Sequence, residues 1–216
     1  DRVELIDLRT HDTHPFERLD ANGFFELHLP LETGLFPYLL HSRSGEEQWE
    51  WEDPYRFSPV VENDELRGFN EGSDRRPFLK LGSHPRAIEE VEGVSFVVWA
   101  PSARSVHLVG DFNSWNPNSL PMRALGSSGC RELFVPHARV GQKYKYGVLG
   151  ADGVLREKSD PFAFKCESPP GNASIVHPLG AREGGGCSLS PLSPGNPQES
   201  PLSIYEMHLG SWKFHE

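Results

Sequence analysis

The chain has 216 residues and a net charge of −10 at pH 7, from 31 acidic and 21 basic side chains. This balance opposes binding to a phosphate backbone or an anionic membrane surface, so we expect no nucleic acid and no membrane among its partners. Gly (21) and Pro (19) are plentiful and favour short strands and turns over long helices, and no apolar run is long enough to cross a bilayer.

The three cysteines, Cys130, Cys166 and Cys187, are odd in number and lie far apart in the sequence. They fit neither a zinc-ligand spacing nor a disulfide framework. We therefore interpret them as incidental thiols and expect a reducing, cytoplasmic setting.

Residues 1–57 predict a partial β-sandwich. The first 20 residues are polar and have little hydrophobic periodicity, whereas residues 23–30 and 36–40 have the character of strands. Counterparts of the opening strands of a complete sandwich are missing from this segment. We therefore expect the chain to enter this first sandwich half-way.

His11 and His14 lie three residues apart, a spacing that could hold a metal ion on a helix. Pro15 follows at once and no further ligand is near, so a solvated segment is the preferred interpretation. The sequence predicts no metal site, and it contains no P-loop, dinucleotide fingerprint or nucleophile elbow.

A connecting segment is predicted over residues 58–83. Residues 63–70 predict a short helix capped by Asn63, and residues 75–81 predict another short helix that ends before Gly82.

Residues 84–178 predict a second β-sandwich. Apolar strands are expected at residues 94–101 and 105–111, and Gly, Pro and Asn punctuate β-branched and aromatic runs at regular spacing. This pattern is typical of an all-β sandwich of the immunoglobulin type.

An internal repeat relates the two sandwiches, because similar segments occur in the same order in both. The matched pairs are residues 23–30 with 129–136, 36–40 with 144–148, and 53–57 with 160–164. The last pair shares an Asp-Pro-aromatic motif. Several matches in one order favour a true repeat over chance.

Trp115 is a candidate for carbohydrate binding. It lies in the turn-rich stretch 110–117 after a predicted strand, and an exposed indole can stack on the C–H face of a glucose unit. The alternative, that it plugs the sandwich end, stays open. Lys145 lies between Tyr144 and Tyr146 and points away from both rings. An ordinary solvated lysine is the preferred interpretation unless Trp115 is its neighbour.

The C-terminal part predicts a linker and a strand. Residues 179–201 are rich in Gly, Ser and Pro, a composition typical of mobile linkers. Residues 202–216 begin with an apolar strand, which needs neighbours to pair its backbone groups. We expect it to open a larger closed sheet that the chain does not complete.

Taken together, the motifs resemble those of a known family. In order, they are residues 96–101, 109–115, 143–146, 160–162, 173–176 and 203–213. The first five resemble the family 48 carbohydrate-binding sandwich that precedes the barrel of α-glucan-processing enzymes. The last looks like the first barrel strand of bacterial glycogen branching enzymes.

This resemblance implies a mostly β chain, in which a family 48 sandwich follows a partial sandwich and precedes the first strand of a missing (β/α)8 barrel. It implies an α-glucan partner such as glycogen, amylose or malto-oligosaccharides, with Trp115, Lys145 and Asn172 at the binding positions. It also implies packing on the missing barrel and no metal or organic cofactor.

The resemblance further implies a retaining transferase that makes α-1,6 branches from α-1,4-glucan in glycogen biosynthesis. Its two catalytic carboxylates would lie on later barrel strands, so we expect no catalytic residue in this chain and no activity from it alone. The alternatives are a separate glycogen-binding module, a structural spacer, or the N-terminal part of a debranching enzyme or trehalohydrolase.

Overall fold

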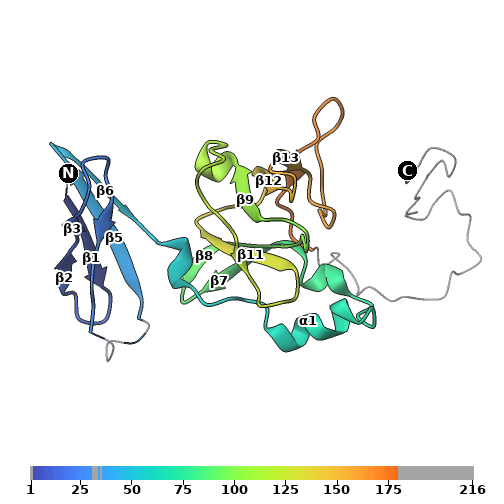
Figure 1. Cartoon of the computed structure of the whole chain (residues 1–216), viewed down its shortest axis with the longest axis horizontal. Helices are drawn as coiled ribbons and strands as arrows, with labels where there is room; N and C mark the ends of the chain where they lie inside the picture. Colours follow the sequence, from blue (N-terminus) through green and yellow to red (C-terminus); the bar gives the residue numbers. More distant parts are fainter. Residues whose placement is uncertain (1, 31–33, 35, 180–216) are drawn as a thin grey trace, which may run out of the picture. The chain divides into compact units, whose positions relative to one another are not determined.

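The computed structural model describes residues 2–30, 34 and 36–179 (Figure 1). This part is mostly β and built from antiparallel sheets, as the sequence predicted. The strand expected at residues 202–216 and nearly all of the linker expected at residues 179–201 lie outside it. Within the described part, no helix is both long and apolar enough to span a bilayer.

The N-terminal sheet has four strands in the order β2-β1-β5-β6, and a two-stranded ribbon β3-β4 accompanies it. Their bounds are β1 Arg2–Asp7, β2 Thr13–Pro15, β3 Glu17–Arg18, β4 Phe25–Glu26, β5 Tyr38–Ser44 and β6 Glu47–Trp51. Strand β1 is a central strand, although the first 20 residues have little periodicity. The hydrophobic period of β1 is interrupted because Asp7, two positions after Leu5, is a buried polar residue. The guanidinium of Arg9 binds its carboxylate.

The sandwich consists of two facing sheets. One has the order β10-β11-β8-β7; in the other, β12 pairs with β9 on one side and with β13 and β14 on the other. Their bounds are β7 Gly82–Ile88, β8 Val91–Trp99, β9 Ser105–Gly110, β10 Arg123–Ala124, β11 Cys130–Pro136, β12 Lys143–Leu149, β13 Leu155–Lys158 and β14 Ser174–Ile175.

Side chains from both sheets form the main hydrophobic core between them. Alternation along each strand sends every second residue inward. The buried members are Val94, Phe96, Val98, Val106, Leu108, Met122, Leu133, Val135, Ala138, Tyr144, Tyr146 and Val176. The two tyrosines of β12 therefore face the core, and Lys145 between them lies on the outer face of its sheet.

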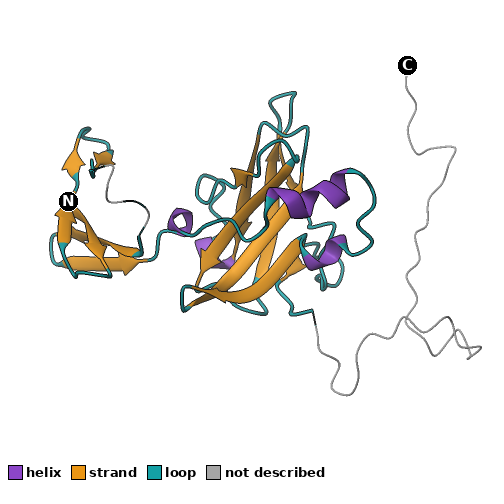
Figure 2. Cartoon of the chain, turned by 90° about the horizontal axis from the view of Figure 1, so that it is seen from below, coloured by secondary structure: helices purple, strands orange, loops and turns teal. Residues whose placement is uncertain are grey.

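Helix α1 (Asn63–Asn70) covers the outer face of the β7–β8–β11 sheet (Figures 1 and 2). Its Leu66 joins Val97 and Cys130 in a second buried cluster. The helix was predicted with an Asn63 cap, but its N-cap is Glu62, whose backbone N–H donates to the Glu65 carboxylate at 3.0 Å. The N-cap lies one residue earlier than predicted because the Glu65 carboxylate pairs the backbone N–H of Glu62, as in a capping box.

The described residues also contain three short 3₁₀ turns: η2 (Pro54–Arg56), η3 (Pro77–Leu79) and η4 (Asp111–Asn113). The second helix predicted at residues 75–81 is only the short turn η3. Proline at its first position starts the turn, and strand β7 begins at Gly82 directly after it.

The sequence repeat reappears in the hydrogen bonds of the Asp-Pro-aromatic motifs. The Asp53 carboxylate accepts from the Tyr38 hydroxyl at 2.7 Å and from the backbone N–H two residues on at 2.8 Å. The Asp160 carboxylate accepts from the hydroxyls of Tyr144 and Tyr146 at 2.7 and 3.1 Å, and likewise from the N–H two residues on at 2.8 Å. In both parts, this aspartate ties the end of a β-hairpin to its first strand.

Candidate functional site

The loop that follows β9 is rigidly held. The Asn113 amide oxygen accepts from the Gly110 N–H at 2.9 Å, and its amide nitrogen donates to the Leu108 carbonyl and the Ser119 hydroxyl at 3.0 and 2.9 Å. A Cβ on Gly110 would lie 2.4 Å from the Lys143 carbonyl oxygen, so only glycine allows this close approach of β9 and β12.

Trp115 emerges from this loop in an unusual backbone conformation. Its φ is 59° and that of Ser114 is 53°, so two successive residues with side chains adopt the left-handed region. Such strain costs about 1–3 kcal/mol per residue and often occurs at functional sites. The residue is 36% exposed, and its indole Nε1–H donates to the Asp111 carboxylate at 3.0 Å. The ring is thus held by its edge while part of it stays open to solvent.

Lys143 links the loops on either side of β12. Its backbone N–H donates to the second carboxylate oxygen of Asp111 at 2.8 Å, and its ammonium pairs with Glu167. Glu167 in turn accepts from the Ala173 N–H at 3.0 Å. The hydrogen bond from Lys143 lowers the pKa of the Glu167 carboxyl, and the same pair raises the pKa of Lys143.

Lys145 projects from the middle of the same sheet. It pairs with Val109 on β9, immediately before the loop that carries Trp115 begins. Its side chain is 18% exposed, and its ammonium lies 3.5 Å from the Glu157 carboxylate of β13. The ammonium is therefore positioned by a partner rather than freely solvated.

Asn172 precedes β14, on the opposite side of β12 from β9. Its carbonyl oxygen accepts from the Ser159 hydroxyl, which fixes the main chain, while the residue is exposed. The three predicted residues therefore come from three neighbouring segments of one sheet: the loop after β9, strand β12, and the segment before β14.

This surface suits a neutral polyhydroxylated ligand. An indole with its edge occupied offers its face for stacking, and ammonium, carboxylate and amide groups from the same sheet and its adjoining segments can bond hydroxyls. Lys143 and Lys145 on this face are each paired with a glutamate, so neither ammonium is left free to select an anionic ligand. Sequence reasoning missed Asp111, Lys143 and Glu167, because each acts through contacts between segments far apart in the chain.

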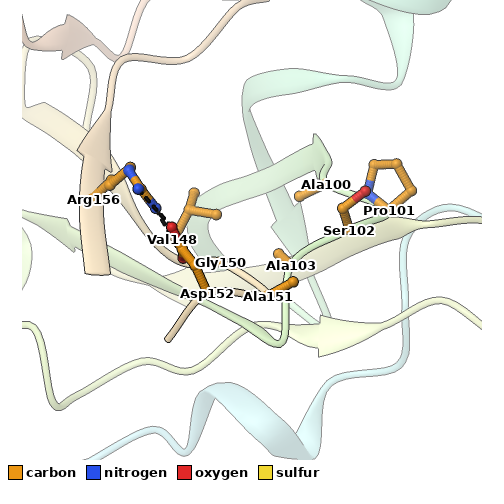
Figure 3. Close-up of a pocket in the computed structure, with 9 residues that line it drawn as sticks. All are labelled: Ala100, Pro101, Ser102, Ala103, Val148, Gly150, Ala151, Asp152 and Arg156. Atoms are coloured by element: carbon orange, nitrogen blue, oxygen red, sulfur yellow. Dashed lines mark hydrogen bonds and ion pairs between the residues drawn. The ribbon is translucent and has the colours of Figure 1, made fainter. Parts of the chain in front are cut away.

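A separate hollow of about 580 Å³ lies at the other ends of β9 and β12 (Figure 3). Ala100, Ala103 and Val148 give it apolar walls, and the ion pair of Asp152 with Arg156, 2.7 Å, lies on one side. None of the three predicted site residues lines it. It is therefore distinct from the Trp115 surface.

Comparison with known protein families gives a match over most of the sandwich. Residues 80–163 match the family described as carbohydrate-binding module 48 (Isoamylase N-terminal domain). The sandwich is of the carbohydrate-binding module 48 type. This confirms the resemblance that the sequence motifs predicted.

Two relatives extend the similarity to most of the chain. The 1,4-alpha-glucan branching enzyme GlgB of Cereibacter sphaeroides is 44% identical over 201 residues, which is 92% of this chain and 28% of that protein. The enzyme of the same name from Mycobacterium ulcerans is 42% identical over 216 residues, which is 98% of this chain and 29% of that protein. The chain thus spans less than a third of the length of these relatives.

Among solved structures, a pullulanase of Anoxybacillus sp. LM18-11 complexed with maltotetraose is 20% identical to the chain. The match covers 81% of this chain and 23% of the pullulanase, with a TM-score of 0.38.

Proposed function

We propose that this chain is the N-terminal region of a 1,4-α-glucan branching enzyme, and that its carbohydrate-binding module 48 sandwich binds an α-glucan chain. The observation that carries the binding proposal is the exposed indole of Trp115, held by Asp111 on the sheet that presents Lys145. Trp115 stacks on a glucose ring, and Lys145 and Asn172 bond its hydroxyls.

The proposed division of the chain follows the sequence boundaries. Residues 1–57 form the partial first sandwich, 58–83 the connection, 84–178 the glucan-binding sandwich, 179–201 a linker, and 202–216 the start of the catalytic barrel, on which the sandwich packs. The branching relatives favour this assignment over a separate binding module, a debranching enzyme or a trehalohydrolase.

Catalysis in this proposal belongs to the part of the relatives that the chain does not span. There, one carboxylate attacks as nucleophile and another serves as acid and base, with retention at the anomeric carbon. The sandwich would hold α-glucan near that chemistry in the cytoplasm. We expect no branching of iodine-stained amylose by the 216-residue chain, and branching by it would contradict this division.

The binding proposal predicts that Trp115→Ala weakens retention on insoluble α-glucan about tenfold, equivalent to about 1.4 kcal/mol. The physical reason is the loss of the stacking face, which hydroxyl-bonding groups alone cannot replace. Affinity electrophoresis in gels that contain amylose measures the change.

Two matched variants sharpen this test. Trp115→Phe keeps an aromatic face and should retain most of the binding. Trp49→Ala removes a tryptophan that is 48% exposed on β6 in the N-terminal sheet, and should leave retention unchanged. Equal retention of the Trp115→Ala and unsubstituted chains would overturn the site.

A further inference from the structure

A second tryptophan of the sandwich stands at the rim of a mixed polar and apolar cavity. Trp99 ends strand β8 and is 50% exposed. It lines a cavity of about 500 Å³ that also includes Asn70 at the end of α1 and the turn at residues 126–129. This volume lies within the range of small-molecule binding pockets.

The Trp99 ring is held in place on its inner side. Its ring meets that of Phe69 from α1 edge to face, with centroids 5.8 Å apart. Gly129 lies behind the indole nitrogen with φ of 77°, and a Cβ there would lie 3.1 Å from Trp99 Nε1 and 2.8 Å from Pro101 Cβ. The turn therefore needs glycine both for its conformation and for the close approach of the indole.

Hydrogen-bonding groups of three kinds line the same cavity as this ring. Asn70 contributes an amide, Ser127 a hydroxyl and Arg131 a guanidinium, one nitrogen of which already donates to the Ala103 carbonyl at 3.0 Å. Asn70 and Ser127 are exposed. Two neutral hydrogen-bonding groups and a guanidinium beside an aromatic face match a sugar ring, whose C–H face is apolar and whose hydroxyls point outward.

The cavity continues into a neighbouring one. A depression of about 410 Å³ shares Asn70 and the turn residues Gly126, Ser127 and Ser128 with it, and extends along α1 to Arg67 and Glu71. The two together provide room for more than one sugar unit.

We propose that the cavity at Trp99 is a second α-glucan site, on a face of the sandwich other than the Trp115 surface. The two belong to different sheets: Trp99 ends β8 of the β7–β8–β11 sheet, and Trp115 follows β9 of the other. A sandwich with two such sites binds two segments of a branched glucan at once, which raises its apparent affinity for the polymer. The identity of the ligand as α-glucan rests on the proposed function.

The test removes the first site and looks for the second. The full chain carrying Trp115→Ala is titrated with maltoheptaose while tryptophan fluorescence is followed. We expect a saturable change in this variant, and an affinity at least tenfold weaker when Trp99→Ala is added. Adding Asn70→Ala, which leaves the Trp99 packing intact, should weaken binding about threefold.

Trp49→Ala in the same background is the matched control and should leave the titration unchanged, since Trp49 is almost equally exposed but lies on another sheet. Circular dichroism of each variant checks the fold. A Trp115→Ala chain that no longer binds maltoheptaose would overturn the second site while leaving the Trp115 site standing. The second site would also be overturned if the Trp115→Ala chain binds maltoheptaose and neither Trp99→Ala nor Asn70→Ala weakens that binding. If Trp115→Ala binds as tightly as the unsubstituted chain and Trp99→Ala does not, the Trp115 site fails and the second site stands.

Discussion

Asp160→Ala is expected to lower the free energy of unfolding of the sandwich by about 4 kcal/mol, since it leaves three donors unpaired, two of them on buried tyrosines, at roughly 1–3 kcal/mol each. The donors are the hydroxyls of Tyr144 and Tyr146 and the N–H of Phe162. Asp160 itself is 5% exposed, and burial raises its pKa. Urea denaturation of the chain, followed by fluorescence, measures the loss.

The repeat supplies the matched control for this prediction. Asp53 makes the same kind of contacts in the N-terminal sheet, but its partner Tyr38 is only half-buried. Water can therefore reach the freed hydroxyl, and Asp53→Ala should cost only about 1 kcal/mol. Equal losses for the two variants would show that burial does not decide the strength of this motif.

Arg123→Ala is expected to cost about 3 kcal/mol, because it leaves a buried carboxylate without its principal partner. Glu132 is fully buried on the outer face of the β7–β8–β11 sheet, and Arg123 bonds it at 2.8 Å. The same guanidinium donates to the Phe57 carbonyl at 2.7 Å, which holds the chain against the sheet directly before the connecting segment begins. Thermal unfolding compares the variant with the unsubstituted chain.

The pH dependence of this loss follows from Glu132. Burial raises the pKa of its carboxyl above the unfolded value, so ionisation of Glu132 costs stability as the pH rises through the raised pKa. Without Arg123, the pKa rises further. The deficit of Arg123→Ala should thus be largest near neutral pH and shrink as the pH falls and Glu132 takes up a proton.

A double variant separates charge burial from packing. Arg123→Met with Glu132→Leu removes both charges and should recover at least half of the loss, because well-packed apolar residues commonly replace a buried ion pair without penalty. A deficit of Arg123→Ala that is independent of pH, together with no recovery in the double variant, would contradict the electrostatic explanation.

The sandwich could be predicted because its strands have clear patterns. Residues 96–101 are a continuous apolar run that ends at a proline, and strand β8 is buried on both of its faces. The β12 tyrosines alternate with lysines that are exposed or half-buried, and they occupy the core positions expected of them. Strand β1 could not be found in this way. Its buried Asp7 places a carboxylate where the alternation favours an apolar side chain. The side-chain hydrogen bonds of Arg9 are the main cause that lowers the pKa of Asp7 to about 2, and they stabilise the carboxylate there.

The candidate site was predicted only in part for a related reason. A turn-rich loop with a tryptophan is visible in the sequence, so Trp115 could be proposed from it. The link between Asp111 and Lys143 is a contact 32 positions apart in the chain, which arises only when β9 and β12 pair. Trp99 looked like an ordinary strand residue, because its exposure depends on where α1 and the turn at Gly129 lie.

The indole N–H resonances of the 15N-labelled chain report whether Trp115 contacts α-glucan, as we claim. On titration with maltoheptaose, we expect the Trp115 resonance to shift progressively and saturably, while those of Trp49 and Trp51 in the N-terminal sheet stay in place. A Trp115 resonance that remains unmoved at saturating maltoheptaose would contradict the claim.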